Sequence, residues 1–271
     1  MTLYNSPRRW IWLMPEPCFL RSPLLAAHGM HGIFSLRNGG VSPPPFDSLN
    51  LADDTGDDAA LVKKNLDILI RQSGINSVPH RSVQVHDCQT LLCSGAGRMH
   101  NEQADILLSG DGNAVAVRVA DCTPILLADP TTGLVAAVHA GWRGTVDRVA
   151  AHAIGSMLNA GATTGNILAC IGPCIGLCCF QIGPETADIL SRSSPGAEAF
   201  VQARDGQYFA DLTALNRLQL AQAGIGQANI EYLVKAPAAC TCCNAQHFFS
   251  YRRDGQASGR HLAIVAPIRS A

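Results

Sequence analysis

The sequence predicts a single domain of the α/β or α+β class, and three observations lead to this prediction. The chain has 271 residues, of which 47% are hydrophobic, so it is long enough to bury a large core. Short apolar runs bounded by turn residues are interspersed with segments of helical spacing. No repeat, linker or shift in composition marks a boundary. We therefore expect residues 1–27 to form an N-terminal segment packed on one domain of residues 28–271.

The elements can be placed in order along the chain. Asp57 and Asp58 precede an amphipathic pattern that ends at Gly74, which predicts a helix between them. Buried strands are expected at 114–119, 124–128, 134–138, 167–171, 230–234 and 261–266. Helices are expected through Val149, Ile154 and Leu158, at 185–191 and at 212–223. Residues 248–255 have the pattern of a strand leading into a turn.

Charge and cysteine usage limit the classes of function. Charged residues make up 15% of the chain and the formal net charge is −1, so neither nucleic acid nor a membrane is an expected partner. Arg8 and Arg9 precede the apolar run Trp10–Met14, which resembles a secretion signal, but Pro15 and Pro17 cut it too short. Eleven cysteines with two adjacent pairs suit a reducing compartment, so the expected location is cytoplasmic.

Seven of the cysteines fall into two groups along the chain. The groups are Cys170, Cys174, Cys178 and Cys179, and then Cys240, Cys242 and Cys243. Together they could build a metal site, but their spacings match no zinc-ribbon or ferredoxin pattern. Buried thiols that pack as small hydrophobic side chains are the favoured interpretation.

His86, Cys122 and His139 are the candidate metal ligands, because each lies at a strand end or beside a glycine loop. One thiolate and two imidazoles leave a fourth tetrahedral position open, which is the composition of a catalytic zinc site. A buried core role is about equally expected for each residue alone, because no pair has a diagnostic spacing. In a second interpretation Cys122 is a nucleophile and His139 its base. Asp121 could orient the base or support the metal.

Basic residues beside glycines are the candidates for binding an anion. Arg143 lies between Gly141 and Gly144 where a helix begins, so backbone N–H groups and a guanidinium could face the same phosphate. Arg37 precedes another glycine turn. Arg252 or Arg253 could reach the active cleft. An ordinary surface position is the competing explanation for each.

Ordered motifs from His28 to Ile264 carry a resemblance to a known family. The motifs are His31-Gly-Ile-Phe-Ser-x-Arg37-x-Gly-Gly-Val-Ser42, Ser48-Leu-Asn50-Leu, Gln84-Val-His86, Val119-Ala-Asp121-Cys122-x-Pro-Ile-Leu-Leu, Ala137-Val-His139-Ala-Gly-Trp-Arg143-Gly-Thr, Ile171-Gly-Pro-Cys-Ile-Gly, Asp211-Leu and Phe248-Phe-Ser-Tyr-Arg-Arg-Asp-Gly. In this order they resemble the laccase-like multi-copper polyphenol oxidoreductases, whose members are now described as purine nucleoside phosphorylases with adenosine deaminase activity.

This resemblance implies one domain of α/β/β/α layers with mixed sheets, similar to proteins described as cysteine hydrolases. It implies zinc held by residues matching His86, Cys122 and His139, although copper could occupy such ligands in vitro. Asp121 is the expected proton carrier beside them. The expected substrate- and phosphate-binding residues are Arg37, Asn50, Gln84 and Arg143. Asp87 stands where the family usually has a glycine after the first ligand histidine.

The expected substrates are phosphate and a purine nucleoside, namely adenosine, inosine, guanosine or methylthioadenosine. Phosphate at Arg143 would attack C1′ of the ribose, and a zinc-activated water would deaminate adenosine at C6. One alternative is a peptidoglycan editing hydrolase that removes L-serine from a UDP-muramyl precursor, as some bacterial relatives are described. A copper polyphenol oxidase is disfavoured, because none of the nine histidines forms a His-x-His pair. A non-catalytic metal-binding protein is disfavoured, because its site would need a fourth protein ligand and the sequence shows no obvious one. No obligate protein partner is expected.

Overall fold

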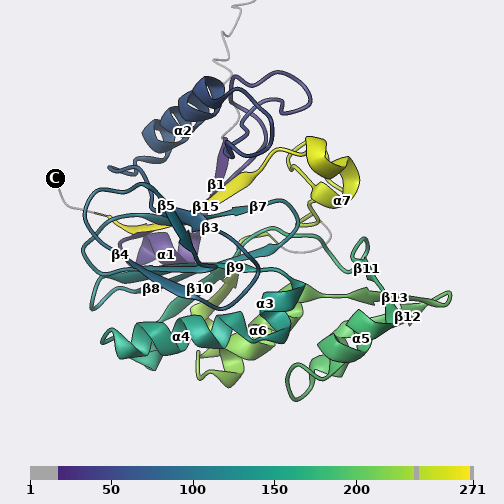
Figure 1. Ribbon diagram of the computed structural model, residues 1–271. Helices are drawn as coiled ribbons and strands as arrows, with labels where there is room; N and C mark the ends of the chain where they lie inside the picture. Colours follow the sequence, from purple (N-terminus) through teal and green to yellow (C-terminus); the bar gives the residue numbers. More distant parts are fainter. Residues whose placement is uncertain (1–17, 235–237, 269–271) are drawn as a thin grey trace, which may run out of the picture.

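The computed structural model describes residues 18–234 and 238–268 (Figure 1). The run Trp10–Met14, with the rest of residues 1–17, lies outside the described residues. The described part of the expected N-terminal segment forms a strand, β1 (Phe19–Arg21), and a short helix, α1 (Pro23–Ala27). Among the described residues, no helix has both the length and the apolar character needed to span a membrane.

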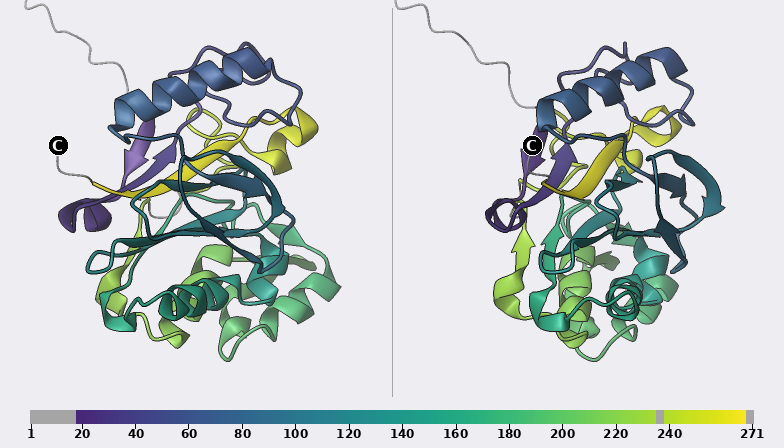
Figure 2. Two further views of the ribbon diagram at one scale, coloured as in Figure 1. Left: turned by 60° about the vertical axis from the view of Figure 1, so that its left-hand side comes forward. Right: turned by 90° about the vertical axis from the view of Figure 1, so that its left-hand side faces the viewer.

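Two β-sheets pack face to face in the middle of the molecule (Figures 1 and 2). The first has the strand order β1-β2-β15-β7, and the second has the order β14-β10-β8-β9-β6-β4. The other strands of the first sheet are β2 (Met30–Ser35), β15 (His261–Pro267) and β7 (Val115–Val119). The second sheet contains β14 (Ile230–Tyr232), β10 (Leu168–Ile171), β8 (Thr123–Asp129), β9 (Leu134–Ala140), β6 (Ile106–Ser109) and β4 (Thr90–Cys93). It is a mixed sheet, because β10 pairs with β14 and β4 with β6 in parallel.

Helices cover the outer face of each sheet (Figure 2). Helix α2 (Ala59–Ser73) covers the first sheet, and α4 (Val149–Asn159) and α6 (Leu212–Gln222) cover the second. The α/β/β/α layering that the resemblance implied is therefore confirmed. The other helices are α3 (Trp142–Val146), α5 (Pro184–Ser191) and α7 (Tyr251–Asp254). The smaller sheets pair β3 (Arg81–Val83) with β5 (Met99–Gln103), and β13 (Gln207–Ala210) with β11 (Gln181–Ile182) and β12 (Val201–Arg204).

Burial on both faces explains the uninterrupted apolar runs of the second sheet. Every residue of β8 and β9 is buried, as expected for strands covered on both sides. Phe34, Val117 and Leu126 fill the space between the two sheets. Ile125 and Ile154 belong to the core between the second sheet and α4.

The predicted helix after Asp58 shows how local signals set an element. The Asp58 side chain accepts the Ala60 N–H at 2.8 Å, and Gly74 ends the helix with a φ of 76°. Leu66 and Leu69 face the first sheet. The three other predicted helices and the six predicted buried strands are also confirmed, with ends that differ by one to a few residues.

The prediction of a strand within residues 248–255 is wrong, because α7 forms there. The Ser250 hydroxyl accepts the Arg253 N–H at 3.3 Å, and the Asp121 carboxylate accepts the Arg252 N–H at 2.6 Å. These two acceptors satisfy amides of the first helical turn. Asp121 is distant in sequence, so the local pattern could not reveal its contribution.

The interpretation of the clustered cysteines as buried thiols is correct only in part. Buried members are Cys170, Cys174 and Cys240. Cys178 and Cys243 are exposed, and Cys179 is half-buried. Cys179 still packs against the apolar cluster that contains Ile175 and Leu190, so packing as small hydrophobic side chains fails to account for Cys178 and Cys243.

Candidate active site and metal centre

The structure brings His86, Cys122 and His139 together at one edge of the second sheet. Cys122 directly precedes β8 and His139 lies near the end of β9, and the pairing of Thr123 with Ala140 places the two side by side. His86 follows β3, and its Nε2 lies 3.8 Å from the Cys122 Sγ. One ligand atom from each of the three residues lies within 4.8 Å of the others. The donor set and its spacing fit a single small metal ion.

Two residues of this site have a strained backbone. His86 has a φ of 67° and Asp121 a φ of 92°, a region that residues other than glycine rarely occupy. Such strain costs about 1–3 kcal/mol per residue and persists only where the surroundings hold it. Two buried carboxylates, Asp105 and Asp121, bind the surrounding loops.

Asp105 is the buried carboxylate that organises the ligands. It lies just before β6, and the pairing of Ile106 with Val138 places it beside His139. His139 Nδ1 lies 2.6 Å from Asp105 Oδ1, and the backbone N–H groups of residues 85–87 donate to the same carboxylate at 2.9–3.1 Å. Burial alone would raise the pKa of Asp105, but these donors lower it below its usual range. Asp105 thus fixes both the His139 ring and the loop that carries His86.

Cys122 and His139 form a charge-coupled pair. Burial opposes ionisation of the Cys122 thiol, but the charge and hydrogen bonds of His139 and His86 lower the pKa to about 6. Burial likewise opposes protonation of His139, but Cys122 and Asp105 raise its pKa above the usual value. The sulfur is therefore a thiolate near neutral pH, the form in which cysteine binds metals or attacks carbon.

The three residues lie in the wall of a cavity of about 470 Å³. Its apolar lining includes Val119, Ile175, Phe180 and Tyr251, and its charged lining includes Asp54, Arg118, Arg252 and Arg260. The volume is within the range of small-molecule sites. An apolar wall and three guanidinium groups thus face the candidate metal centre.

Gln84 and Asp121 are sequence-predicted residues that the structure places in this cavity. The Gln84 side chain exchanges two 2.8 Å hydrogen bonds with the backbone of Arg118. The Asp121 carboxylate accepts the Thr241 hydroxyl at 2.6 Å and the Ser250 hydroxyl at 3.0 Å, besides the Arg252 N–H. Its proton-carrying role stays a prediction, while its contacts connect three segments around the cavity.

Arg37, Asn50 and Arg143 are not among the residues that line the cavity. The Arg37 guanidinium donates to the carbonyl of Asp47 at 2.9 Å and stacks over Phe249. Asn50 is fully buried; its Nδ2 donates to the Ala52 carbonyl and the Thr55 hydroxyl, and its Oδ1 accepts the Arg260 N–H at 2.9 Å. Arg143 lies over the Trp142 ring, 4.5 Å from its centroid. The binding roles expected for these three residues stay predictions without support from the geometry.

Sequence reasoning missed Asp105, Arg118 and Arg260. A weak signal existed for two of them: Asp105 precedes the apolar run 106–108, and Arg118 is the charged residue in an otherwise apolar strand. Arg260 lies next to β15, whose pairing of His261 with Val119 brings it beside the cavity. That proximity depends on strand order, which the sequence pattern did not specify.

Gly141 is expected to be intolerant of a side chain. A Cβ at this position would lie 2.7 Å from His86 Cδ2 and 3.3 Å from Cys122 Sγ. Gly141→Ala should therefore displace His86 and weaken metal binding by at least about tenfold, measured by competition with a chromophoric chelator. Gly155→Ala is the matched control, because a Cβ there meets no atom within 4 Å and should stabilise α4. Equal metal affinity in the two variants would contradict the placement of Gly141.

The fold and this site define a layered α/β protein with a candidate metal centre at a sheet edge. The chain belongs to the family described as multi-copper polyphenol oxidoreductase laccase, which matches residues 31–267. The family that the motifs suggested is thus confirmed.

Named relatives and solved structures agree with this membership. The chain is 34% identical over 249 residues to a purine nucleoside phosphorylase of Deinococcus radiodurans, covering 91% of each. It is 34% identical over 239 residues to the purine nucleoside phosphorylase YfiH of Escherichia coli strain K12, covering 88% of this chain and 93% of the relative. The crystal structure of YlmD from Geobacillus stearothermophilus has a TM-score of 0.82 at 30% identity, covering 94% and 98% of the two chains.

Proposed function

We propose that the protein is a zinc-dependent purine nucleoside phosphorylase that acts on adenosine, inosine, guanosine or methylthioadenosine and also deaminates adenosine. The observation that carries this proposal is the cavity in which His86, Cys122 and His139 face an apolar wall and three arginines. The chain matches most of the length of relatives named purine nucleoside phosphorylase, which supports an enzyme that uses a nucleoside and phosphate.

The nucleoside is proposed to bind along the apolar wall. The half-exposed Tyr251 offers an aromatic ring on which a purine can stack, and the buried Phe180 contributes apolar lining. Arg252 already covers Phe180, with its guanidinium 5.4 Å from the ring centroid, and Arg260 lies 5.5 Å from the Tyr251 ring. The aromatic and cationic groups alternate, so base and phosphate can bind side by side.

Phosphate is proposed to bind between Arg252 and Arg260. Arg118 is partly neutralised, because its Nη1 lies 3.1 Å from Asp54 and 3.6 Å from Asp53. Within the part of the chain that the structure describes, Arg252 and Arg260 donate to backbone carbonyls and form no ion pair with a carboxylate. Their charges are therefore available to an oxyanion, which planar guanidinium groups bind well.

His86, Cys122 and His139 are proposed to hold the zinc. The set has one thiolate and two imidazoles, with the His139 tautomer fixed by Asp105. Zinc bound there would supply a Lewis acid at an open fourth position facing the substrate. The chain itself contributes the orientation of that ion, the stacking surface for the base and the cations that hold phosphate in line with C1′.

Replacing Arg252 should separate phosphate binding from nucleoside binding. Arg252→Met is expected to raise the KM for phosphate by roughly 10- to 100-fold, because a charge-assisted hydrogen bond is lost. The KM for the nucleoside should change less. Arg143→Met is the matched control, since Arg143 lies over Trp142 outside the cavity lining. A larger phosphate effect in Arg143→Met would instead support the expectation drawn from its motif.

The function itself is tested with full-length protein purified anaerobically and loaded with zinc. It is incubated with adenosine or inosine, with and without phosphate, and chromatography reports free base, ribose phosphate and inosine. Phosphate-dependent release of base that disappears in Cys122→Ala supports the proposal. No turnover by protein that holds stoichiometric zinc would refute it.

The peptidoglycan editing hydrolase remains a second candidate because of one observation. In space, the Cys122 thiolate contacts the His139 ring, and the Asp105 carboxylate orients that ring. This is the arrangement of a thiol hydrolase. His86→Ala distinguishes the two candidates. It should remove zinc and nucleoside turnover together, whereas a thiol hydrolase would retain its nucleophile and release L-serine from a UDP-muramyl substrate without metal.

A further inference from the structure

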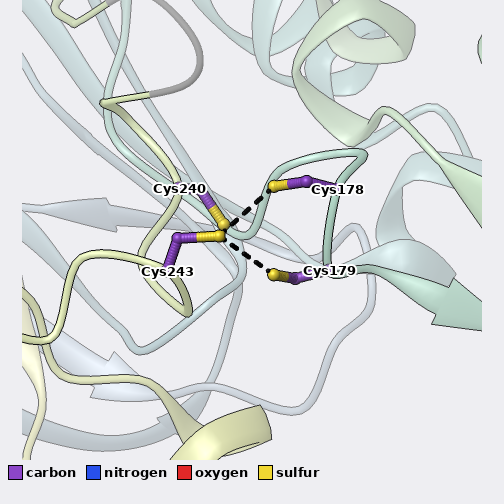
Figure 3. Close-up of side chains that lie close together, drawn as sticks. All are labelled: Cys178, Cys179, Cys240 and Cys243. Atoms are coloured by element: carbon purple, nitrogen blue, oxygen red, sulfur yellow. Dashed lines mark hydrogen bonds between the residues drawn. The ribbon is translucent and has the colours of Figure 1, made fainter.

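Four cysteines from two distant loops converge at a second place in the molecule. Cys178 and Cys179 follow β10, and Cys240 and Cys243 precede α7. Figure 3 shows the four side chains turned toward one another. All four Sγ atoms lie within 4.8 Å of each other.

The distances within this four-cysteine cluster suit metal coordination. Cys243 Sγ lies 3.5 Å from Cys178 Sγ and 3.2 Å from Cys179 Sγ. A disulfide needs sulfurs about 2.05 Å apart, whereas zinc–sulfur bonds of about 2.3 Å place tetrahedral ligands roughly 3.8 Å apart. The two observed separations are closer to the second arrangement.

The surroundings of the cluster are those of a thiolate site. The Gly176 N–H donates to Cys240 Sγ at 3.3 Å, and a Cβ at Gly176 would lie 3.3 Å from Cys178 Sγ. Arg252 donates to the carbonyl of Cys179 at 3.2 Å. Arg253 donates to the carbonyls of Thr241 and Cys242 at 3.0 and 3.1 Å. A tetrathiolate with one zinc carries a net charge of −2; Arg253 is paired with Asp254 at 2.7 Å, so the guanidinium of Arg252 is the nearby cation that would partly offset this charge.

We propose that Cys178, Cys179, Cys240 and Cys243 bind a zinc ion in a tetrathiolate site separate from the His86, Cys122 and His139 centre. Four sulfur ligands in a tetrahedron are typical of zinc or iron–sulfur sites, and closed four-ligand sites are structural. Binding releases the thiol protons, because thiolates are the ligands.

Such a site would hold together two loops that form part of the cavity wall. Ile175 and Phe180 flank one cysteine pair, and Tyr251 and Arg252 follow the other, and all four residues line the cavity. The cluster therefore joins the two loops that carry these groups. The neighbouring Cys242 packs in the apolar cluster with Ile175 and takes no part in the four-cysteine set.

A third group of candidate ligands, His80, Cys93 and His100, is satisfied without an ion. His80 Nδ1 lies 2.8 Å from His100 Nε2, and Cys93 Sγ lies 3.7 Å from the carbonyl of Leu91. Its mixed nitrogen and sulfur donors also make it spectroscopically distinct from the four-cysteine cluster.

Elemental analysis of the full-length chain, purified anaerobically with zinc, tests the proposal. We expect two zinc ions per wild-type chain, one in Cys122→Ala and one in the double variant Cys178→Ser, Cys243→Ser. Cys242→Ser is the matched control and should keep both. No zinc in Cys122→Ala, or the same zinc content in the double variant as in the wild type, would overturn the proposal.

X-ray absorption on zinc-loaded Cys122→Ala keeps the test valid if the double variant fails to fold. Its zinc should be surrounded by four sulfur atoms and no nitrogen. Nitrogen ligands, which would indicate the His80 group, an iron–sulfur chromophore, a disulfide within the cluster, or no bound zinc would each overturn the proposal. None of these readouts depends on which substrate the enzyme uses.

Discussion

Replacing Cys122 with alanine is expected to lower kcat/KM for nucleoside phosphorolysis by at least about 1,000-fold. The variant loses the thiolate among the three candidate ligands, leaving His86 and His139. A bound metal supplies several kcal/mol of transition-state stabilisation, and each 1.36 kcal/mol changes the rate tenfold. The measurement combines steady-state kinetics with the metal content of the same sample.

Cys88→Ala provides the matched control for this prediction. Cys88 is half-buried, and its Sγ bonds to the carbonyl of Asp147 at 3.4 Å outside the ligand set. Burial raises the pKa of its thiol to about 11, so it is neutral at working pH. Full activity in Cys122→Ala, or the same loss in Cys88→Ala, would be incompatible with Cys122 as the ligand.

Replacing Asp105 with asparagine is expected to lower metal affinity and kcat/KM by roughly 10- to 100-fold each. The amide removes the negative charge that orients His139 through Nδ1. It also weakens the hydrogen bonds that hold His86 in its strained conformation. We expect a stability loss of about 2–4 kcal/mol as well, because charged acceptors of buried donors are worth more than neutral ones.

Asp129→Asn separates the loss of stability from the loss of metal affinity. Asp129 is fully buried and accepts backbone N–H groups from Thr131 at 2.9 Å and Thr163 at 3.0 Å, but it lies at the far end of β8 from Cys122. It should lose comparable stability in urea denaturation and keep its zinc. If both variants keep full zinc affinity, Asp105 has no role in organising the ligands.

The three candidate ligands could be predicted from the sequence because each carries a local signal. His86, Cys122 and His139 all stand where an apolar run meets a turn, and strand ends of one sheet lie at the same edges. The motifs around them were also specific enough to identify the family. Residues with a weak local signal were missed, as Asp105 shows, since its role follows from pairing beside His139.

At the candidate phosphate site, the strength of the local sequence signal did not match the position of the residue in the structure. Arg143 had the stronger local signal, a glycine loop before a helix, yet it lies over Trp142 outside the cavity lining. Arg252 and Arg260 line the cavity although their own segments resemble ordinary turns. The helix after Gly141 is only the five residues of α3, so the geometry adds no support to the anion site that the sequence indicated there, and that site stays a prediction.

The sequence by itself determined the class of fold, most of the helices and strands, and the candidate metal ligands. Helical and strand periodicity, caps and apolar runs are properties of neighbouring residues, so they can be recognised without the fold. Tertiary structure decided which distant groups meet: Asp121 with Ser250, 129 positions apart, and Cys179 with Cys243, 64 positions apart. Such contacts depend on the order and register of strands, which arise only when the two sheets and their helices pack against each other.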